Sequence, residues 1–163
     1  MEVLAGPSVE TRGDVATLGI RTIVPFRGML AYRDRLLTEL VTWLDEHDIN
    51  AVGHFFLRLH VIDMTGPMDI EVGVTEIVHA GDHRVHPGTL PAGRYATLTY
   101  RDHSLRANRA LLDWAKTQGH ALDRIMIDTG DEFGCRTETY LTDPRTEPRK
   151  TRWAVELTIR LAD

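Results

Sequence analysis

Leu40-Val41-Thr42-Trp43 and Leu111-Leu112-Asp113-Trp114 are similar stretches at corresponding places in the two halves of the chain. The first belongs to an apolar stripe of helical spacing that runs from Leu37 to Leu44. The second belongs to a similar stripe that runs from Ala107 to Ala115. A repeated amphipathic helix indicates a chain built from two related modules.

Strand-like runs surround both helices in the same order, with one run before each helix and two after it. These runs are 18–24, 55–61 and 69–74 in the first half, and 94–100, 136–141 and 153–161 in the second. Chain breakers are concentrated in 86–93, which predicts the joint between the halves. The run 124–128 is apolar but too short to assign.

We therefore predict an α+β fold of two tandem βαββ modules with pseudo-twofold symmetry. Antiparallel sheets and two main helices would enclose a central ligand groove near the symmetry axis. Residues 1–163 form a single domain in this prediction, with pseudo-repeat halves at about 9–86 and 87–163.

Composition narrows the function. Of 163 residues, 42% are hydrophobic and 26% charged, and the formal net charge is −5. The one basic stretch, 145–150, is interrupted by Glu147 and Pro148, so direct nucleic-acid binding is not expected. A single cysteine, Cys135, excludes an internal disulfide and a cysteine-rich zinc site. There is no signal-peptide pattern or membrane-length apolar stretch, which predicts a cytoplasmic protein without a membrane partner.

Glu138 is the most informative polar position. It lies in Thr137-Glu138-Thr139-Tyr140-Leu141-Thr142-Asp143-Pro144, inside a probable strand, with Tyr140 at the next position on the same face. An acid and an aromatic that face the same way favour a pocket for a cationic or polarised ring system. The alternative is a solvated acid facing an arginine beside an ordinary sheet tyrosine.

Alternation within the strands separates apolar faces from mixed ones. We expect the apolar faces to pack under the helices and the mixed faces to line the cleft. The mixed faces collect Phe56, Arg58, His60, Glu71, Glu138, Tyr140 and Glu156.

Several motifs, taken in order, resemble the GyrI-like small-molecule-binding family, which is also the effector domain of multidrug-sensing regulators. They are 90–96 (Leu-Pro-Ala-Gly-Arg-Tyr-Ala), 112–114, 138–144 and 155–159, with the acid-then-Val-Gly strand 69–74 in the first half. The family pattern departs at Arg101-Asp102-His103-Ser104, where Gly-Pro-Tyr is usual. The chain also has no helix-turn-helix segment, so the resemblance predicts a stand-alone form.

The resemblance implies an aromatic-lined groove for bulky, often cationic or planar molecules. By motif position, Glu138 would be the buried anchor and Glu156 a second acid. Some family members are implied to be hydrolases that open the cyclopropane ring of DNA-alkylating natural products, in which case Glu138 would be catalytic. The predicted ligand-binding residues are Glu138, Tyr140, Tyr95, Phe56, Glu156, Glu71, Trp153 and Trp114.

For most of these predicted ligand-binding residues, the alternative is a purely structural role. The tryptophans lie on apolar faces and suit a core, and Glu71 and Glu156 suit an exposed strand. His79 and His83 have the spacing of a helical zinc pair, but Gly81 and Pro87 indicate a turn, so neither a metal site nor a cofactor is predicted.

Three functions follow in order of preference. The first is a multidrug-binding protein that captures bulky aromatic cations by sequestration or sensing, with a role in drug resistance. The second is the cyclopropane hydrolase. The third is a protein-interaction module, such as a gyrase-inhibitor-like acidic mimic of DNA, and whether any protein partner exists stays open.

Overall fold

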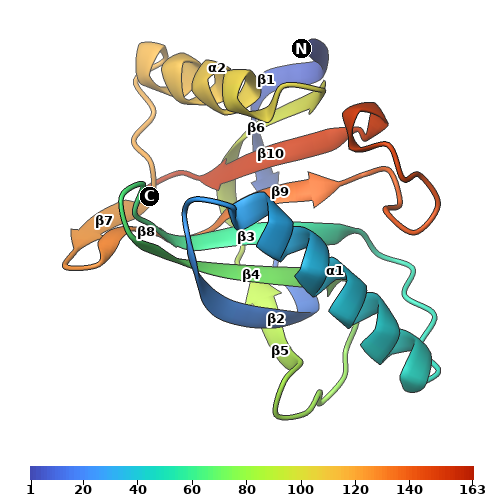
Figure 1. Cartoon of the computed structure of the whole chain (residues 1–163). Coiled ribbons are helices and arrows are strands. Elements are labelled where there is room, and N and C mark those ends of the chain that lie inside the picture. The colour runs from blue at the N-terminus through green and yellow to red at the C-terminus, as the bar shows by residue number, and fades with distance from the viewer.

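The computed structural model describes residues 1–163, in which antiparallel strands form one 10-stranded sheet (Figure 1). The strands are β1 (Glu2–Arg12), β2 (Val15–Pro25), β3 (Phe55–Ile62), β4 (Pro67–Thr75), β5 (His86–Leu90), β6 (Gly93–Arg101), β7 (Arg124–Ile127), β8 (Gly130–Phe133), β9 (Arg136–Tyr140) and β10 (Val155–Arg160). A 3-10 turn, η1 (Lys150–Arg152), precedes β10. The predicted α+β class is confirmed.

The strand order reveals the internal symmetry. Across the sheet it reads β1-β6-β10-β9-β3-β4-β2-β5. Exchanging β1 with β5, β2 with β6, β3 with β9 and β4 with β10 gives the same order read backwards. The pseudo-twofold axis therefore passes between β3 and β9, where Leu57 pairs with Glu138.

Two helices cover one face of the sheet, α1 (Met29–Glu46) beside β2 and β4 and α2 (Ser104–Thr117) beside β6 and β10 (Figure 1). Each helix begins after a residue in the left-handed region, Gly28 at φ 82° and His103 at φ 63°. No helix combines the length and the apolarity that a membrane crossing requires. The buried faces consist of Arg33, Leu36, Leu37, Leu40, Trp43 and Leu44 of α1 and Ala107, Leu111 and Ala115 of α2.

Sequence reasoning missed β1, β5 and β8, and the first two interlock the halves. β1 pairs with β6 of the second half, and β5 pairs with β2 of the first. β5 occupies much of the segment predicted as a joint. Pro87 and Gly88 are tolerated there because β5 is an edge strand, where one side of the ladder needs no partner. The unassigned run 124–128 contributes β7, which pairs with β8 as a hairpin beside β3.

Candidate functional site

One row of side chains crosses the sheet from β2 to β6 on the helix-covered face. In order, its members are Ile20, Val72, Leu57, Glu138, Leu157 and Leu98. All are buried, and only Glu138 is not aliphatic. A buried carboxylate costs free energy unless it is paired or hydrogen-bonded, so packing alone does not account for an acid in this row.

Two residues link Glu138 to the helix above it. Glu138 is 8% exposed, and its Oε2 accepts a hydrogen bond of 3.3 Å from the Tyr140 hydroxyl. The same hydroxyl accepts a hydrogen bond of 3.3 Å from Nη1 of Arg33, on α1. A guanidinium from the first half of the chain is thus connected through a phenol to a carboxylate in the second half.

Aromatic rings complete the surroundings of Arg33. Its guanidinium carbon lies 5.5 Å from the centroid of the Tyr140 ring and 5.7 Å from that of Trp153. The two rings are themselves 5.2 Å apart and tilted. These distances are within the range in which a cation is attracted to an aromatic face. Tyr140, Trp153 and Glu138 together form what we call the acid–aromatic site.

Burial governs the protonation of the site. It raises the pKa of Glu138, and the nearby Arg33, the Tyr140 hydrogen bond, Arg136 and Asn108 offset this only in part. Burial also raises the pKa of Tyr140, with the charge of Glu138 acting in the same direction. A carboxyl group with a raised pKa exchanges protons closer to neutral pH than a free one, so it suits proton transfer.

Four residues near Glu138 were missed by the sequence prediction: Arg33, Tyr100, Asn108 and Arg136. Arg33 and Arg136 both favour the charged form of Glu138, and burial followed by the Glu138 charge raises the pKa of Tyr100. The sequence pattern could have indicated two of these residues, Arg33 and Tyr100. Arg33 continues the apolar stripe of α1 one turn before Leu37, and Tyr100 shares its strand face with Leu98.

Four predicted site residues lie on the opposite face of the sheet: Phe56, Tyr95, Glu71 and Glu156. The prediction that the mixed strand faces form one surface is wrong, because Leu57 pairs with Glu138, whereas Phe56 pairs with Thr139. Alternation within a strand identifies its two faces. It does not identify which of them continues a given face of the neighbouring strand, since that depends on register.

Each of these four residues has its own partner on that face. Phe56 is 0% exposed and its ring lies against Gly73. Glu71 contacts Nε2 of His60 at 2.8 Å, Glu156 accepts two hydrogen bonds from Arg12 at 2.8 and 3.0 Å, and Tyr95 donates to the Pro91 carbonyl at 2.5 Å. They are therefore absent from the surroundings of Glu138.

The predicted Trp114 and the histidine-rich segment also lie away from Glu138. The ring of Trp114, at the far end of α2, lies beside His120 at 5.6 Å. In the histidine-rich segment, Asp82 accepts hydrogen bonds of 2.8 Å from Trp43 Nε1 and from the backbone amides of Arg84 and Val85. Side chains of His, Cys, Asp and Glu nowhere gather in threes as a metal site needs.

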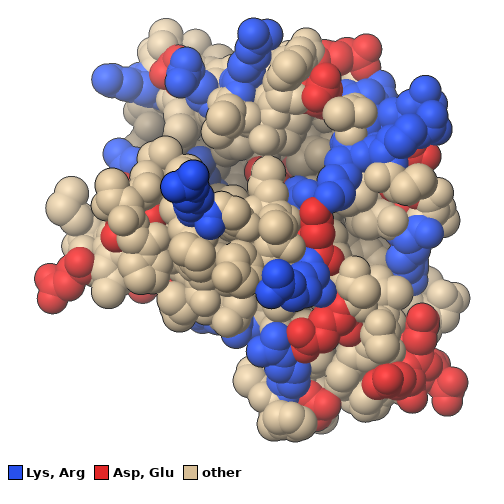
Figure 2. All heavy atoms as spheres, viewed as in Figure 1, with Lys and Arg blue, Asp and Glu red and all other residues tan.

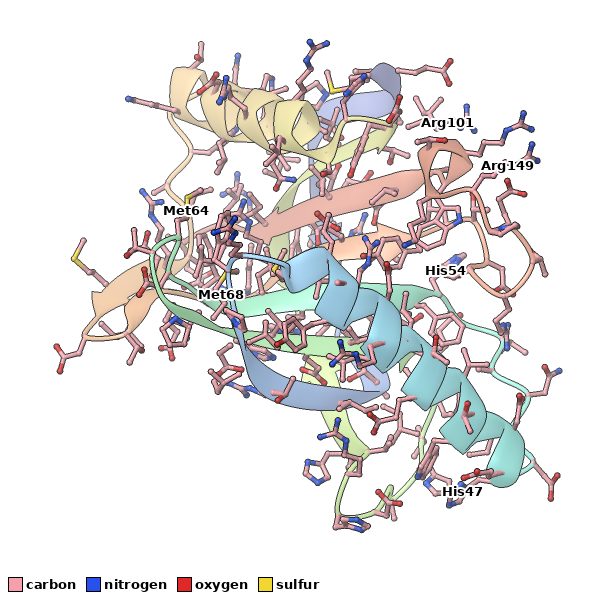
Figure 3. All side chains as sticks on the ribbon, viewed as in Figure 1. His47, His54, Met64, Met68, Arg101 and Arg149 are labelled. Carbon is pink, nitrogen blue, oxygen red and sulfur yellow. The ribbon has the colours of Figure 1, made fainter.

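Figure 2 shows a recess between α1 and α2 with acidic atoms at its base. A cavity of about 400 Å³ adjoins the acid–aromatic site through Tyr140, the one residue of the site in its lining, which also includes Phe55, His54, Asp143 and Arg145. A larger cavity of about 450 Å³ contains Met64 in its lining and none of the predicted site residues. Figure 3 labels His54 and Met64 and places them on opposite sides of the sheet's centre. The smaller cavity is therefore the one next to the site.

Solved structures share this fold although their sequences are distant. EcmrR, in a complex with DNA, superposes with a TM-score of 0.69 at 14% identity, over 96% of this chain and 57% of that chain. The EcmrR C-terminal domain alone gives 0.58 at 14% identity, over 96% of each chain. This chain thus spans little more than half of the EcmrR chain in the DNA complex but nearly all of the C-terminal domain.

Two further neighbours differ in what they bind or do. SAV2435 bound to tetraphenylphosphonium gives a TM-score of 0.60 at 12% identity, over 99% of this chain and 94% of that one. A hydrolase from Listeria innocua gives 0.59 at 11% identity, over 95% and 91%. No family model and no curated protein matches the sequence. These neighbours are consistent with the fold predicted from the GyrI-like resemblance, and at such low identity they establish the fold alone.

Proposed function

We propose that this protein is a GyrI-like small-molecule-binding protein that captures bulky aromatic cations at the acid–aromatic site. The observation that carries the proposal is Glu138, the only acid in a buried aliphatic row, hydrogen-bonded to Tyr140, whose ring lies 5.2 Å from that of Trp153. A carboxylate attracts positive charge from any direction, and flat rings accept many shapes, so such a site tolerates diverse ligands. The tetraphenylphosphonium complex of SAV2435 supports the choice of ligand class.

Titration with tetraphenylphosphonium, followed by isothermal calorimetry, tests the proposal. Glu138→Gln keeps the shape of the side chain but removes the charge, so the affinity should fall by roughly tenfold to a hundredfold, the usual effect of losing a charged interaction. Glu156→Gln is the matched control, because Glu156 lies on the opposite face and pairs with Arg12. Equal affinities for wild type and Glu138→Gln, or an equal loss in both variants, would contradict the proposal.

The second candidate is a hydrolase that opens the cyclopropane ring of a DNA-alkylating compound. It is favoured by the raised pKa of Glu138 and by two tyrosine hydroxyls, those of Tyr140 and Tyr100, in its surroundings. Glu138 would take a proton from water, whose oxygen bonds to one ring carbon. The strained carbon–carbon bond breaks and its electron pair passes into the conjugated substrate carbonyl, which a tyrosine hydroxyl polarises. The proton taken from water ends on that carbonyl oxygen.

Turnover separates the two candidates. The hydrolase requires ring-opened product when the wild-type protein is incubated with a cyclopropane alkylator, detected by mass spectrometry. Glu138→Gln should still bind the alkylator but form little product. If the wild type binds tetraphenylphosphonium and leaves the alkylator intact, the hydrolase candidate is rejected and the binding protein stands.

A further inference from the structure

Arg33 is unusual among the arginines of this chain because it is buried within the apolar stripe of α1. It is 7% exposed, and the stripe continues with Leu36, Leu37 and Leu40. A charged group at a core position costs free energy unless opposite charge and hydrogen bonds compensate it. Arg33 is compensated from two sides, by the acid–aromatic site and by Asp34.

The contacts of Arg33 are those expected of a cationic ligand. The guanidinium lies against the rings of Tyr140 and Trp153, donates to the Tyr140 hydroxyl and is close enough to Glu138 to favour its ionised form. A cation that enters the same space would use the same rings and the same carboxylate. Two cations cannot share one carboxylate without mutual repulsion.

The charges around Glu138 also indicate that Arg33 occupies the place of a ligand cation. Arg136 also favours the ionised form of Glu138, and it donates to Asn108 Oδ1 at 3.0 Å. With Arg33 in place, Glu138 thus has two positive neighbours. The resting site therefore carries no surplus negative charge to offer a ligand.

Arg33 also has a second partner toward solvent. Its Nε and Nη2 donate to Oδ1 of the half-buried Asp34, at 3.1 and 2.9 Å. Lys150 of η1 contacts the other oxygen of Asp34. Asp34 can keep a hydrogen bond to the guanidinium while the far end of the side chain leaves the rings, since it contacts the opposite side of the guanidinium from Tyr140.

Resting on the proposed function, we infer that Arg33 is a built-in competitor of cationic ligands, and that a ligand cation binds by displacing its guanidinium from Tyr140, Trp153 and Glu138. This makes Arg33 a determinant of specificity. A small cation gains no more than Arg33 loses, whereas a bulky aromatic cation also buries ring area. A neutral aromatic molecule of similar size does not interact with the carboxylate as a cation does, so it competes less directly with the Arg33 guanidinium.

The test compares two probes on the wild type and on Arg33→Met, which keeps an apolar chain but no charge. The probes are tetraphenylphosphonium and triphenylphosphine oxide, which presents similar rings without a charge. At pH 8, Arg33→Met should bind the cation about tenfold more tightly, equivalent to about 1.4 kcal/mol. Its affinity for the neutral probe should change by less than about threefold.

Two variants control the comparison. Arg35→Met removes an exposed arginine that also stacks on an aromatic ring, Tyr32 at 5.1 Å, on the same helix. It should leave both affinities unchanged. If Arg33→Met does not fold, Arg33→Gln gives the same comparison with a side chain that can still hydrogen-bond to Tyr140, and circular dichroism confirms that either variant is folded.

The outcomes separate this inference from the proposed function. If the wild type binds tetraphenylphosphonium and Arg33→Met or Arg33→Gln binds it no more tightly, Arg33 is not a competitor and the proposed function still stands. A rise of the same size for both probes would show that Arg33 only fills space, which also overturns the inference. If no variant binds either probe, the proposed function fails as well.

Discussion

Leu57 and Glu138 occupy paired positions on the two central strands, yet one is an ordinary core residue and the other an acid. Their flanking positions are alike, since Val72 lies beyond Leu57 and Leu157 beyond Glu138. The two halves therefore share a backbone frame, and where it meets the axis one half has a leucine and the other an acid. A duplicated fold can thus have a single site close to its axis, because only one half needs to replace an apolar core residue with a functional one.

The opposite face shows a different kind of asymmetry. In the first half, Phe56 pairs with Gly73, which pairs with Gly19. In the second half the corresponding row is Thr137, Thr158 and Thr97, with Thr137 and Thr158 hydroxyls 2.6 Å apart. One large ring beside two glycines replaces three medium side chains. On this face the halves differ in how they fill space, whereas on the helix-covered face they differ in charge.

An acid at the central position of both halves should have the largest effect on stability. In Leu57→Glu a second carboxylate would lie opposite Glu138 with no cation left to pair with it. We expect a loss of about 3–5 kcal/mol in the free energy of unfolding, because a buried charge without a partner is costly and like charges on paired positions repel. Urea denaturation at pH 7 measures the loss.

Leu141→Glu is the control for this substitution, since Leu141 is 39% exposed at the end of the same strand region as Glu138. It should change the free energy of unfolding by no more than about 0.5 kcal/mol. If Leu57→Glu proves as stable as this control, the centre of the sheet tolerates charge in either half, and Glu138 loses its special position.

Filling the space beside Phe56 tests the packing asymmetry. A Cβ at position 73 would lie 2.5 Å from Phe56 Cζ and 2.9 Å from the backbone oxygen of Leu18. Phe56 is fully buried and the Leu18 oxygen belongs to the backbone, so Gly73→Ala should cost about 1–3 kcal/mol through overpacking. Thermal unfolding followed by circular dichroism would show the change.

Gly13→Ala is the matched control, because a Cβ there meets no atom within 4 Å. Its effect on the free energy of unfolding should stay within about 0.5 kcal/mol. Equal stabilities for the two glycine variants would mean that Phe56 and Gly73 do not form a close-packed pair.

Much of the fold could be predicted from the sequence because periodicity is a local property. The two helices, with their stripes ending near Leu44 and Ala115, and the six strands of the βαββ order follow from spacing along the chain. β1 and β5 could not be predicted in this way, because each pairs with a strand of the other half. The alternation of residues within a strand does not indicate which strand it pairs with.

The candidate site was predictable only where residues share a strand. Glu138 and Tyr140 are two positions apart, so alternation alone brings them to one face. Arg33 reaches them from a helix more than a hundred residues earlier in the chain. An arginine that interrupts an apolar stripe does not indicate a site unless its contact with the distant strand is known. Phe56 and Tyr95 were misplaced because aromatic character does not reveal which face of the sheet a residue joins.

Glu138 and Glu156 allow the smallest and most specific comparison, that of two acids on opposite faces of neighbouring strands. Burial raises the pKa of Glu138 above its usual 4.5. A carboxyl group with a raised pKa in the folded state contributes stability that is fully present below the unfolded pKa and is lost as pH rises through the folded pKa. Glu138→Gln should therefore match the wild type near pH 4 and become more stable than it as pH rises, by about 1.4 kcal/mol for each pH unit within that window.

Glu156→Gln should behave in the opposite way. Glu156 pairs with Arg12 at 2.8 Å in a partly exposed position, so its substitution should cost up to about 1 kcal/mol at neutral pH rather than add stability. Free energies of unfolding from urea titrations at pH 4, 5, 6 and 7 give both curves. If Glu138→Gln loses stability relative to the wild type as pH rises, Arg33 and Tyr140 more than compensate the buried charge. The acid would then serve to hold α1 on the sheet, and the site would have no carboxylate to spare for a ligand.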